Sequence, residues 1–126
     1  MIYLACPYSD PDPAVRRDRF LKANKQAALF MSEGLHVFSP ISHCHPIARQ
    51  GDLPTNWKYW KAYDKKILSI CSELCVLTIP GWKKSKGVRG EMEIAVALDL
   101  SITLVRMGNP IRVPFEMAFA VGLVTQ

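Results

Sequence analysis

The chain has 126 residues, of which 49% are hydrophobic and 21% are charged, and its formal net charge is +5 at pH 7. This length allows one domain with its own core, and the absence of repeats and low-complexity tracts argues against repeat and disordered architectures. The positive charge favours anionic partners, but it does not separate nucleic acid from phosphorylated metabolites or from solubility alone. We therefore expect one soluble globular domain over residues 1–126.

The first third of the chain predicts a strand, a helix and a second strand. Residues 2–6 (IYLAC) form a short apolar run that ends at a proline-rich turn, which is typical of a buried strand. A helix is expected from about residue 14 to 33, with Asp10 or Asp12 as its N-cap and Gly34 as its stop. A strand should follow over residues 35–39.

The remaining elements are expected to alternate in the same way. Residues 41–56 contain prolines and a glycine without a clear period, so we interpret them as a long loop. Periodicity then predicts a helix over about 57–71, a strand over 74–79, a helix over about 87–98 and a strand over 102–106. The apolar segment 113–124 is too short for a membrane span and contains Glu116, so we interpret it as a packed C-terminal helix.

Alternating helices and continuously apolar strands are typical of parallel pairing, with helices covering both faces of the sheet. The expected fold is a three-layer α/β domain of flavodoxin or Rossmann type, with a small parallel sheet of four to five strands. Ligands of such sheets bind at the carboxyl ends of the strands. A ligand site is therefore expected among residues 7–12, 40–56 and 80–86, which follow the carboxyl ends of the predicted strands.

Two acidic residues are expected to face inward from neighbouring helices. At 100° per residue, Glu91 lies within the apolar arc of its helix, whereas Glu93 lies outside it. Asp64 lies in the middle of the apolar arc of the preceding helix. Buried carboxylates are rare and often functional, although each acid could instead be a boundary residue paired with a lysine.

The segment before Glu91 has the features of an anion-binding helix start. Ser85 is placed to cap the helix, and the amides of Lys86 and Gly87 would then be free to bind an anion or water. Glu91 comes early in this helix, where the positive end of the helix dipole favours an ionised carboxylate. An ionised glutamate at this position could act as a nucleophile.

The cysteines predict reduced thiols rather than a disulfide framework, because they are scattered through apolar segments. They are Cys6, Cys44, Cys71 and Cys75. Their spacing, even with His43 and His45 added, matches no structural zinc pattern, so neither a metal nor another cofactor is expected. Residues 1–9 resemble no export signal, and we expect a cytoplasmic protein.

These residues together resemble the nucleoside 2-deoxyribosyltransferase superfamily, which includes deoxynucleoside 5′-monophosphate N-glycosidases. The resemblance rests on the opening IYLACPY, on an aspartate-bearing helix ahead of the strand LCVLTI, and on the spacing of Ser85, Gly87, Glu91 and Ala95. It spans nearly the whole chain. The pattern is most similar to small bacterial and phage relatives.

The resemblance implies that Glu91 is the nucleophile and that Asp64 assists at the base or the ribose. It also implies that Tyr8 borders the sugar pocket. Ser85 matches the serine with which the monophosphate hydrolases contact the 5′-phosphate, and Lys86 would support the same group. The expected partner is a nucleoside or nucleotide, and the expected assembly is a homodimer or homotetramer.

Some features depart from the pattern and leave alternatives open. Cys6 replaces the usual glycine after the first strand, and His43 and His45, which could contact phosphate or base, are not part of the motif. The activity could be hydrolysis or transfer, the substrate could be a ribosyl nucleotide such as NAD, or the chain could be a non-catalytic nucleotide-binding or regulatory module. No membrane partner is expected, and nucleic acid is disfavoured because the basic residues follow no recognised motif.

Overall fold

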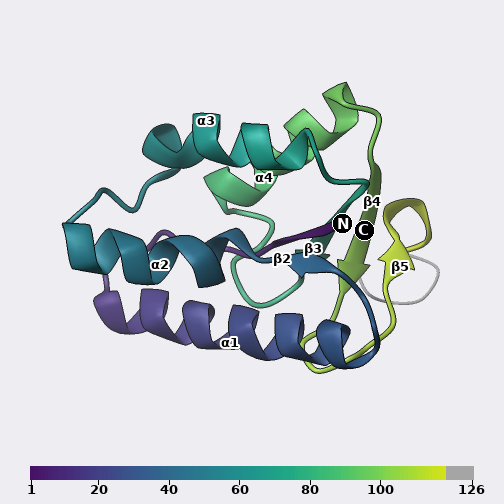
Figure 1. Ribbon diagram of the computed structural model, residues 1–126, viewed down its shortest axis with the longest axis horizontal. Helices are drawn as coiled ribbons and strands as arrows, with labels where there is room; N and C mark the ends of the chain where they lie inside the picture. Colours follow the sequence, from purple (N-terminus) through teal and green to yellow (C-terminus); the bar gives the residue numbers. More distant parts are fainter. Residues whose placement is uncertain (119–126) are drawn as a thin grey trace.

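A five-stranded sheet runs through the computed structural model, which describes residues 1–118 (Figure 1). Its strands are β1 Ile2–Ala5, β2 Val37–Phe38, β3 Glu73–Leu77, β4 Ser101–Val105 and β5 Val113–Pro114. The strand order is β2-β1-β3-β4-β5, in which the first four are parallel and β5 is antiparallel to β4. The prediction of a parallel α/β sheet of four to five strands is thus confirmed, with an added antiparallel edge.

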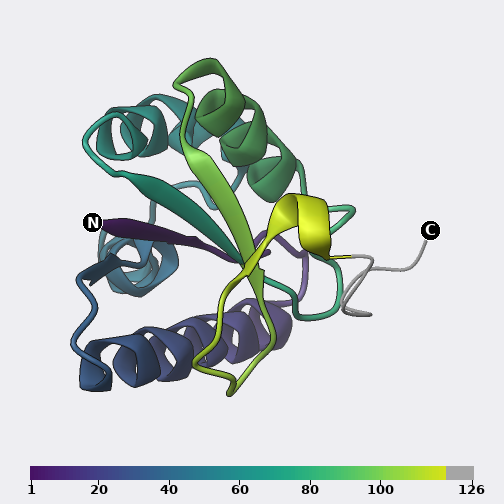
Figure 2. The same ribbon diagram turned by 90° about the vertical axis from the view of Figure 1, so that its right-hand side faces the viewer.

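Helices cover both faces of this sheet (Figure 2). They are α1 Pro13–Ser32, α2 Pro40–Gly51, α3 Trp57–Leu68 and α4 Lys86–Ala97. Alternate residues of β1 point to opposite sides: Leu4 packs in the core with α1, whereas Tyr3 packs in the core with α3 and α4. Both residues are fully buried, as strands between two helical layers require.

The first helix begins and ends where the sequence predicts. The Asp12 side chain accepts a hydrogen bond from the Ala14 amide at 2.9 Å, and Pro13 occupies the first helical position. Gly34 follows the last turn with a φ of 83°, a left-handed conformation that glycine adopts without steric cost. Of the two possible N-caps, Asp12 is therefore the one used.

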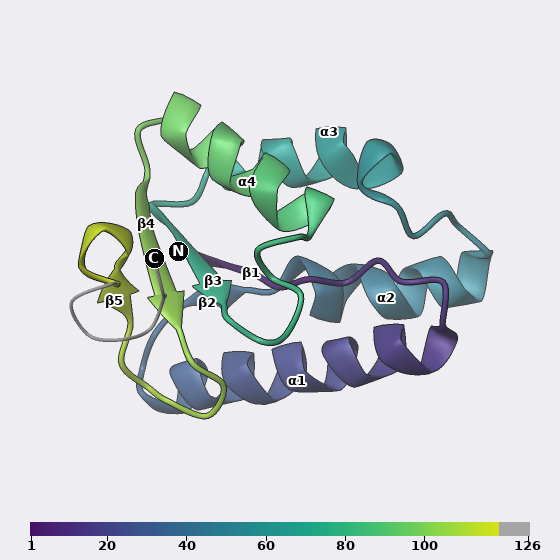
Figure 3. The ribbon, with the colours of Figure 1, turned by 180° about the vertical axis from the view of Figure 1, so that it is seen from behind.

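The prediction of a long loop over residues 41–56 is wrong, because most of that segment forms α2. Ser39 caps this helix through a 3.2 Å bond from the Ser42 amide, and the helix continues past Pro46. Ile41, His45 and Ala48 lie at helical spacing and are buried on one face of α2. This packing offsets the backbone hydrogen bond that is lost because proline has no amide proton. In the ribbon views α2 lies between α1 and α3 (Figures 1 and 3).

The predicted C-terminal helix is wrong where the structure describes it. Residues Val113–Pro114 form the edge strand β5, and Phe115–Met117 form a short 3-10 turn. The rest of that prediction, from residue 119 onward, lies outside the described residues. Among residues 1–118, no helix is both long enough and apolar enough to cross a membrane.

Candidate active site

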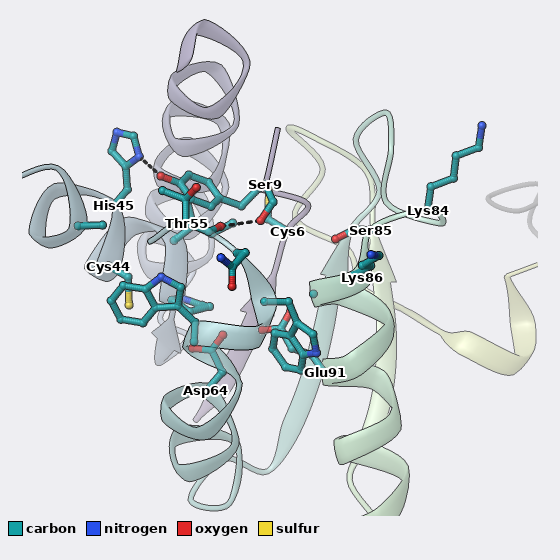
Figure 4. Close-up of a pocket in the computed structure, with 18 residues that line it drawn as sticks. Cys6, Ser9, Cys44, His45, Thr55, Asp64, Lys84, Ser85, Lys86 and Glu91 are labelled. Atoms are coloured by element: carbon teal, nitrogen blue, oxygen red, sulfur yellow. Dashed lines mark hydrogen bonds between the residues drawn. The ribbon is translucent and has the colours of Figure 1, made fainter. Parts of the chain in front are cut away.

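A cavity of about 400 Å³ opens at the carboxyl ends of β1 and β3 (Figure 4). The chain passes from β1 outward to β2 and then returns across β1 to β3, so these two strands flank the point where the strand order reverses. Open α/β sheets bind ligands in the crevice at this point. The cavity is lined by residues that follow β1, β2 and β3, in agreement with the segments that the sequence indicated.

Asp64 and Glu91 meet in this cavity. Asp64 comes from α3 and Glu91 from α4, and the two helices pack against each other. Asp64 is 8% exposed and Glu91 is 4% exposed, and both carboxylates point into the cavity (Figure 4). Glu93, two residues further on, is exposed. The inward orientation of both acids, predicted from helical periodicity, is therefore confirmed.

Tyr3 is a site residue that the sequence reasoning missed. Its hydroxyl donates a hydrogen bond to the Glu91 carboxylate from the middle of the sheet. Asp64 Oδ1 is buried without a hydrogen-bond partner, and within residues 1–118 neither acid forms an ion pair. The strand pattern gave only one signal for Tyr3, namely that its phenol would need a polar partner once it was buried.

Burial shifts both acids towards their neutral forms. It raises the pKa of Asp64 to about 7, an effect that the nearby Tyr3 hydroxyl partly offsets. The pKa of Glu91 lies well above its ordinary value because of burial first and the Asp64 charge second, while the hydrogen bond from Tyr3 acts in the opposite direction. Near neutral pH the coupled pair can therefore hold a proton, while the hydrogen bond from Tyr3 favours the ionised form of Glu91.

The start of α4 forms another part of the cavity wall. Ser85 Oγ accepts a hydrogen bond from the Val88 amide at 3.1 Å, which confirms Ser85 as the N-cap. In the part of the chain that the structure describes, the amides of Lys86 and Gly87 have no hydrogen-bond partner. These amides and the hydroxyl proton of Ser85 can therefore bind an anion. Lys84 extends away from the two acids (Figure 4).

Two indoles that the sequence reasoning left out of the site complete this part of the wall. Trp57 lies so close to α4 that a Cβ atom on Gly90 would come within 2.3 Å of the indole ring. Trp60 is anchored by its indole nitrogen, which donates to the Pro54 carbonyl at 2.7 Å. Both line the cavity, and aromatic faces of this kind suit a planar base.

The other predicted binding residues divide into two groups. Cys6, Tyr8 and His45 line the cavity, and the Tyr8 hydroxyl is hydrogen-bonded to His45 Nδ1. Burial raises the pKa of the Cys6 thiol to about 12, so the thiol is neutral. His43 lies outside this cavity, where its Nε2 is 3.0 Å from the hydroxyl of Tyr63. The structure thus brings together the predicted residues other than His43.

Comparison with known proteins identifies a family without naming an activity. No curated protein matches the chain. A family model described as a domain of unknown function, DUF1937, matches residues 1–107. This match covers the strands β1–β4, all four helices of the described part and both acids of the cavity. The chain therefore belongs to the DUF1937 family.

Proposed function

We propose that the chain cleaves or transfers the N-glycosidic bond of a nucleoside or nucleoside 5′-monophosphate, with Glu91 as the nucleophile. The observation that supports this best is the pair of buried carboxylates without ion pairs, of which one has a pKa near neutrality and the other accepts a hydrogen bond from Tyr3. Glycoside cleavage needs such a pair, one acid to protonate the leaving group and one carboxylate to attack. The resemblance to nucleoside 2-deoxyribosyltransferases leads to the same residues.

In the first step, a Glu91 oxygen attacks the anomeric carbon while the bond from that carbon to the base nitrogen breaks. The bonding electrons leave with the base, and the Asp64 carboxyl supplies the proton that neutralises it. The products are a free base, a glycosyl ester on Glu91 and an Asp64 carboxylate. The hydrogen bond from the Tyr3 hydroxyl favours the ionised form of the attacking carboxylate before the reaction.

In the second step, the Asp64 carboxylate takes a proton from an acceptor as that acceptor attacks the anomeric carbon. The ester bond to Glu91 breaks, and both acids return to their starting states. Water as the acceptor makes the chain a hydrolase, whereas a second base makes it a transferase. The same residues serve both reactions.

The rest of the cavity suits the two ends of a nucleotide. The indoles of Trp57 and Trp60 offer flat apolar surfaces for a base, whose stacking on an aromatic ring is worth about 1–3 kcal/mol in nucleic-acid complexes. The free amides of Lys86 and Gly87, with the Ser85 hydroxyl, would bind the 5′-phosphate.

The alternative function is a nucleotide-binding module without turnover. The raised pKa of Glu91 favours it, because a glutamate that stays protonated cannot attack a sugar. On this account the parent protein releases no base, and its affinity for a nucleotide survives Glu91→Gln.

Base release from a panel of nucleosides, deoxynucleoside 5′-monophosphates and dinucleotides, followed by chromatography, tests the proposal. We expect release from at least one member and its loss in Glu91→Gln. Glu93→Gln is the matched control, because it changes an exposed glutamate of the same helix. Unchanged release by Glu91→Gln would refute Glu91 as the nucleophile, and no release by the parent protein would favour the binding module.

A further inference from the structure

A second cavity, of about 490 Å³, adjoins the candidate active site. It lies between the first turns of α1 and the second half of α2. Four residues line both cavities, namely Tyr8, His45, Ala48 and Thr55. The cavity lined by Asp64 and Glu91, which we call the acid-lined cavity, is therefore next to the second cavity. One extended ligand can occupy both.

The second cavity, which we call the arginine cavity, is lined by Arg16, Arg17 and Arg49. Arg16 donates a hydrogen bond to the Asp10 carbonyl, and within residues 1–118 Arg17 and Arg49 have neither an ion pair nor a hydrogen bond from their side chains. The acid of this wall, Asp52, is exposed to solvent. Arginine side chains gathered around one cavity favour an anion, because their planar groups bind phosphate through paired hydrogen bonds.

His45 adds a buried polar atom to the same wall. Its ring is fixed by stacking on Phe20, with ring centroids 4.3 Å apart, and by the hydrogen bond between its Nδ1 and the Tyr8 hydroxyl. The residue is 5% exposed, and its Nε2 is buried without a hydrogen-bond partner. If Tyr8 donates to Nδ1, Nε2 carries the ring proton and can donate it to a ligand oxygen.

We propose that the arginine cavity binds phosphoryl groups, so that the ligand of this protein carries a di- or triphosphate chain. Arg16, Arg17 and Arg49 would contact the phosphate oxygens, while the nucleoside part of the same ligand occupies the acid-lined cavity. The phosphate subsite stands on its own observations, and only the nucleoside part rests on the proposed function. The proposed ligand class thereby extends from a nucleoside monophosphate to a nucleoside polyphosphate or dinucleotide.

The first test measures the binding of inorganic pyrophosphate by calorimetry, with a chelator present to remove divalent cations. We expect Arg17→Gln and Arg49→Gln each to weaken binding about tenfold, because each removes one charge-assisted contact. Lys25→Gln removes the same charge from an exposed site on α1 outside the cavity and should change the affinity less than twofold. Equal losses in all three variants, or no binding by the parent protein, would overturn the subsite.

The second test compares a nucleoside with its monophosphate and diphosphate. We expect the diphosphate to bind at least about tenfold tighter than the monophosphate, and Arg17→Gln and Arg49→Gln to abolish only that advantage. Equal affinity for the monophosphate and the diphosphate would overturn the proposal that one ligand occupies both cavities. These measurements do not depend on turnover, so they can succeed in Glu91→Gln even if the proposed glycosidase activity is absent.

Discussion

Carboxylates at the two ends of the same sheet differ in whether they have a charged partner. At the start of β3, both oxygens of Glu73 lie 2.8 and 2.9 Å from one Arg112 nitrogen, and Thr103 donates a third bond at 2.7 Å. Near the carboxyl ends of the strands, Asp64 and Glu91 are more deeply buried, yet within the described residues neither of them forms an ion pair. A chain with 16 lysines and arginines thus pairs the structural acid and leaves these two unpaired.

The difference separates an acid that is paired within the fold from two acids that we propose to be catalytic. A buried carboxylate without a partner destabilises a protein, and it persists where its altered pKa is useful. The unpaired acids line a cavity together with Lys86 and Gly87, whose amides are free, whereas Glu73 lies in a closed set of hydrogen bonds. Exchanging acids for amides at the two ends should therefore have opposite effects.

The largest expected effect comes from Glu91→Gln compared with Glu73→Gln. The rate of base release should fall at least about 10³-fold in Glu91→Gln, because the amide cannot form the glycosyl ester. Glu73→Gln should leave this rate within twofold, since Glu73 lies at the other end of the sheet. Steady-state kinetics of both variants measure these rates. Equal losses of activity in the two variants would contradict a special role of Glu91.

Asp64→Asn should stabilise the fold, and more so at high pH. Because burial raises the pKa of Asp64 from 3.8 to about 7, the native state loses stability as the pH rises from about 4 to 7. The asparagine variant avoids this loss, so its advantage in unfolding free energy should grow by about 3 kcal/mol between pH 4.5 and pH 8. Urea unfolding at both pH values measures it, and a pH-independent difference would contradict the assigned burial effect.

The paired end should respond in the opposite direction. Glu73→Gln should lower the free energy of unfolding by about 1–3 kcal/mol at neutral pH, because Arg112 would lose a charged partner. A double-mutant cycle with Arg112→Gln isolates the pair, for which we expect a coupling of about 1–2 kcal/mol. A coupling energy near zero would mean that Arg112 does not stabilise the Glu73 carboxylate, so that the two ends of the sheet would not differ.

Tyr3→Phe should have the smallest of these effects. Removing the phenol takes away the hydrogen bond that lowers the pKa of Glu91, so a larger part of Glu91 would be protonated at a given pH. We expect base release to fall about tenfold and the acidic limb of its pH profile to move up by about one unit. If the rate falls equally at every pH, so that the pH profile keeps its shape, Tyr3 contributes only to packing.

The acids and the helix cap could be predicted because they depend on local periodicity. Asp64 and Glu91 lie within helices whose apolar arcs can be read from a dozen residues, and Ser85 directly precedes one of these helices. The structure confirms the burial of both acids and the cap. Helix α2 was not predicted, because its segment contains prolines and a glycine and shows no clear period. The Ser39 cap and Pro40 at the first helical position were the available evidence.

Other parts of the site depend on contacts between distant segments. Tyr3 and Glu91 are 88 positions apart, and no local pattern links the phenol of a buried strand to that carboxylate. The arginine cavity likewise needs α1 and α2 side by side, and the sequence reasoning contained no α2. Such contacts are fixed by the tertiary packing of the helices, which is why they emerged only with the fold.

The central claim, that Glu91 carries the glycosyl group, can be tested by trapping the intermediate. A nucleotide with fluorine at the sugar 2′ position slows breakdown of the ester by destabilising the oxocarbenium-like transition state. Mass spectrometry of the trypsin-digested protein should then find one sugar on the peptide of residues 90–106, and fragmentation should place it on Glu91 rather than Glu93. Base release without an adduct at Glu91, or with the sugar on another residue, would contradict the account.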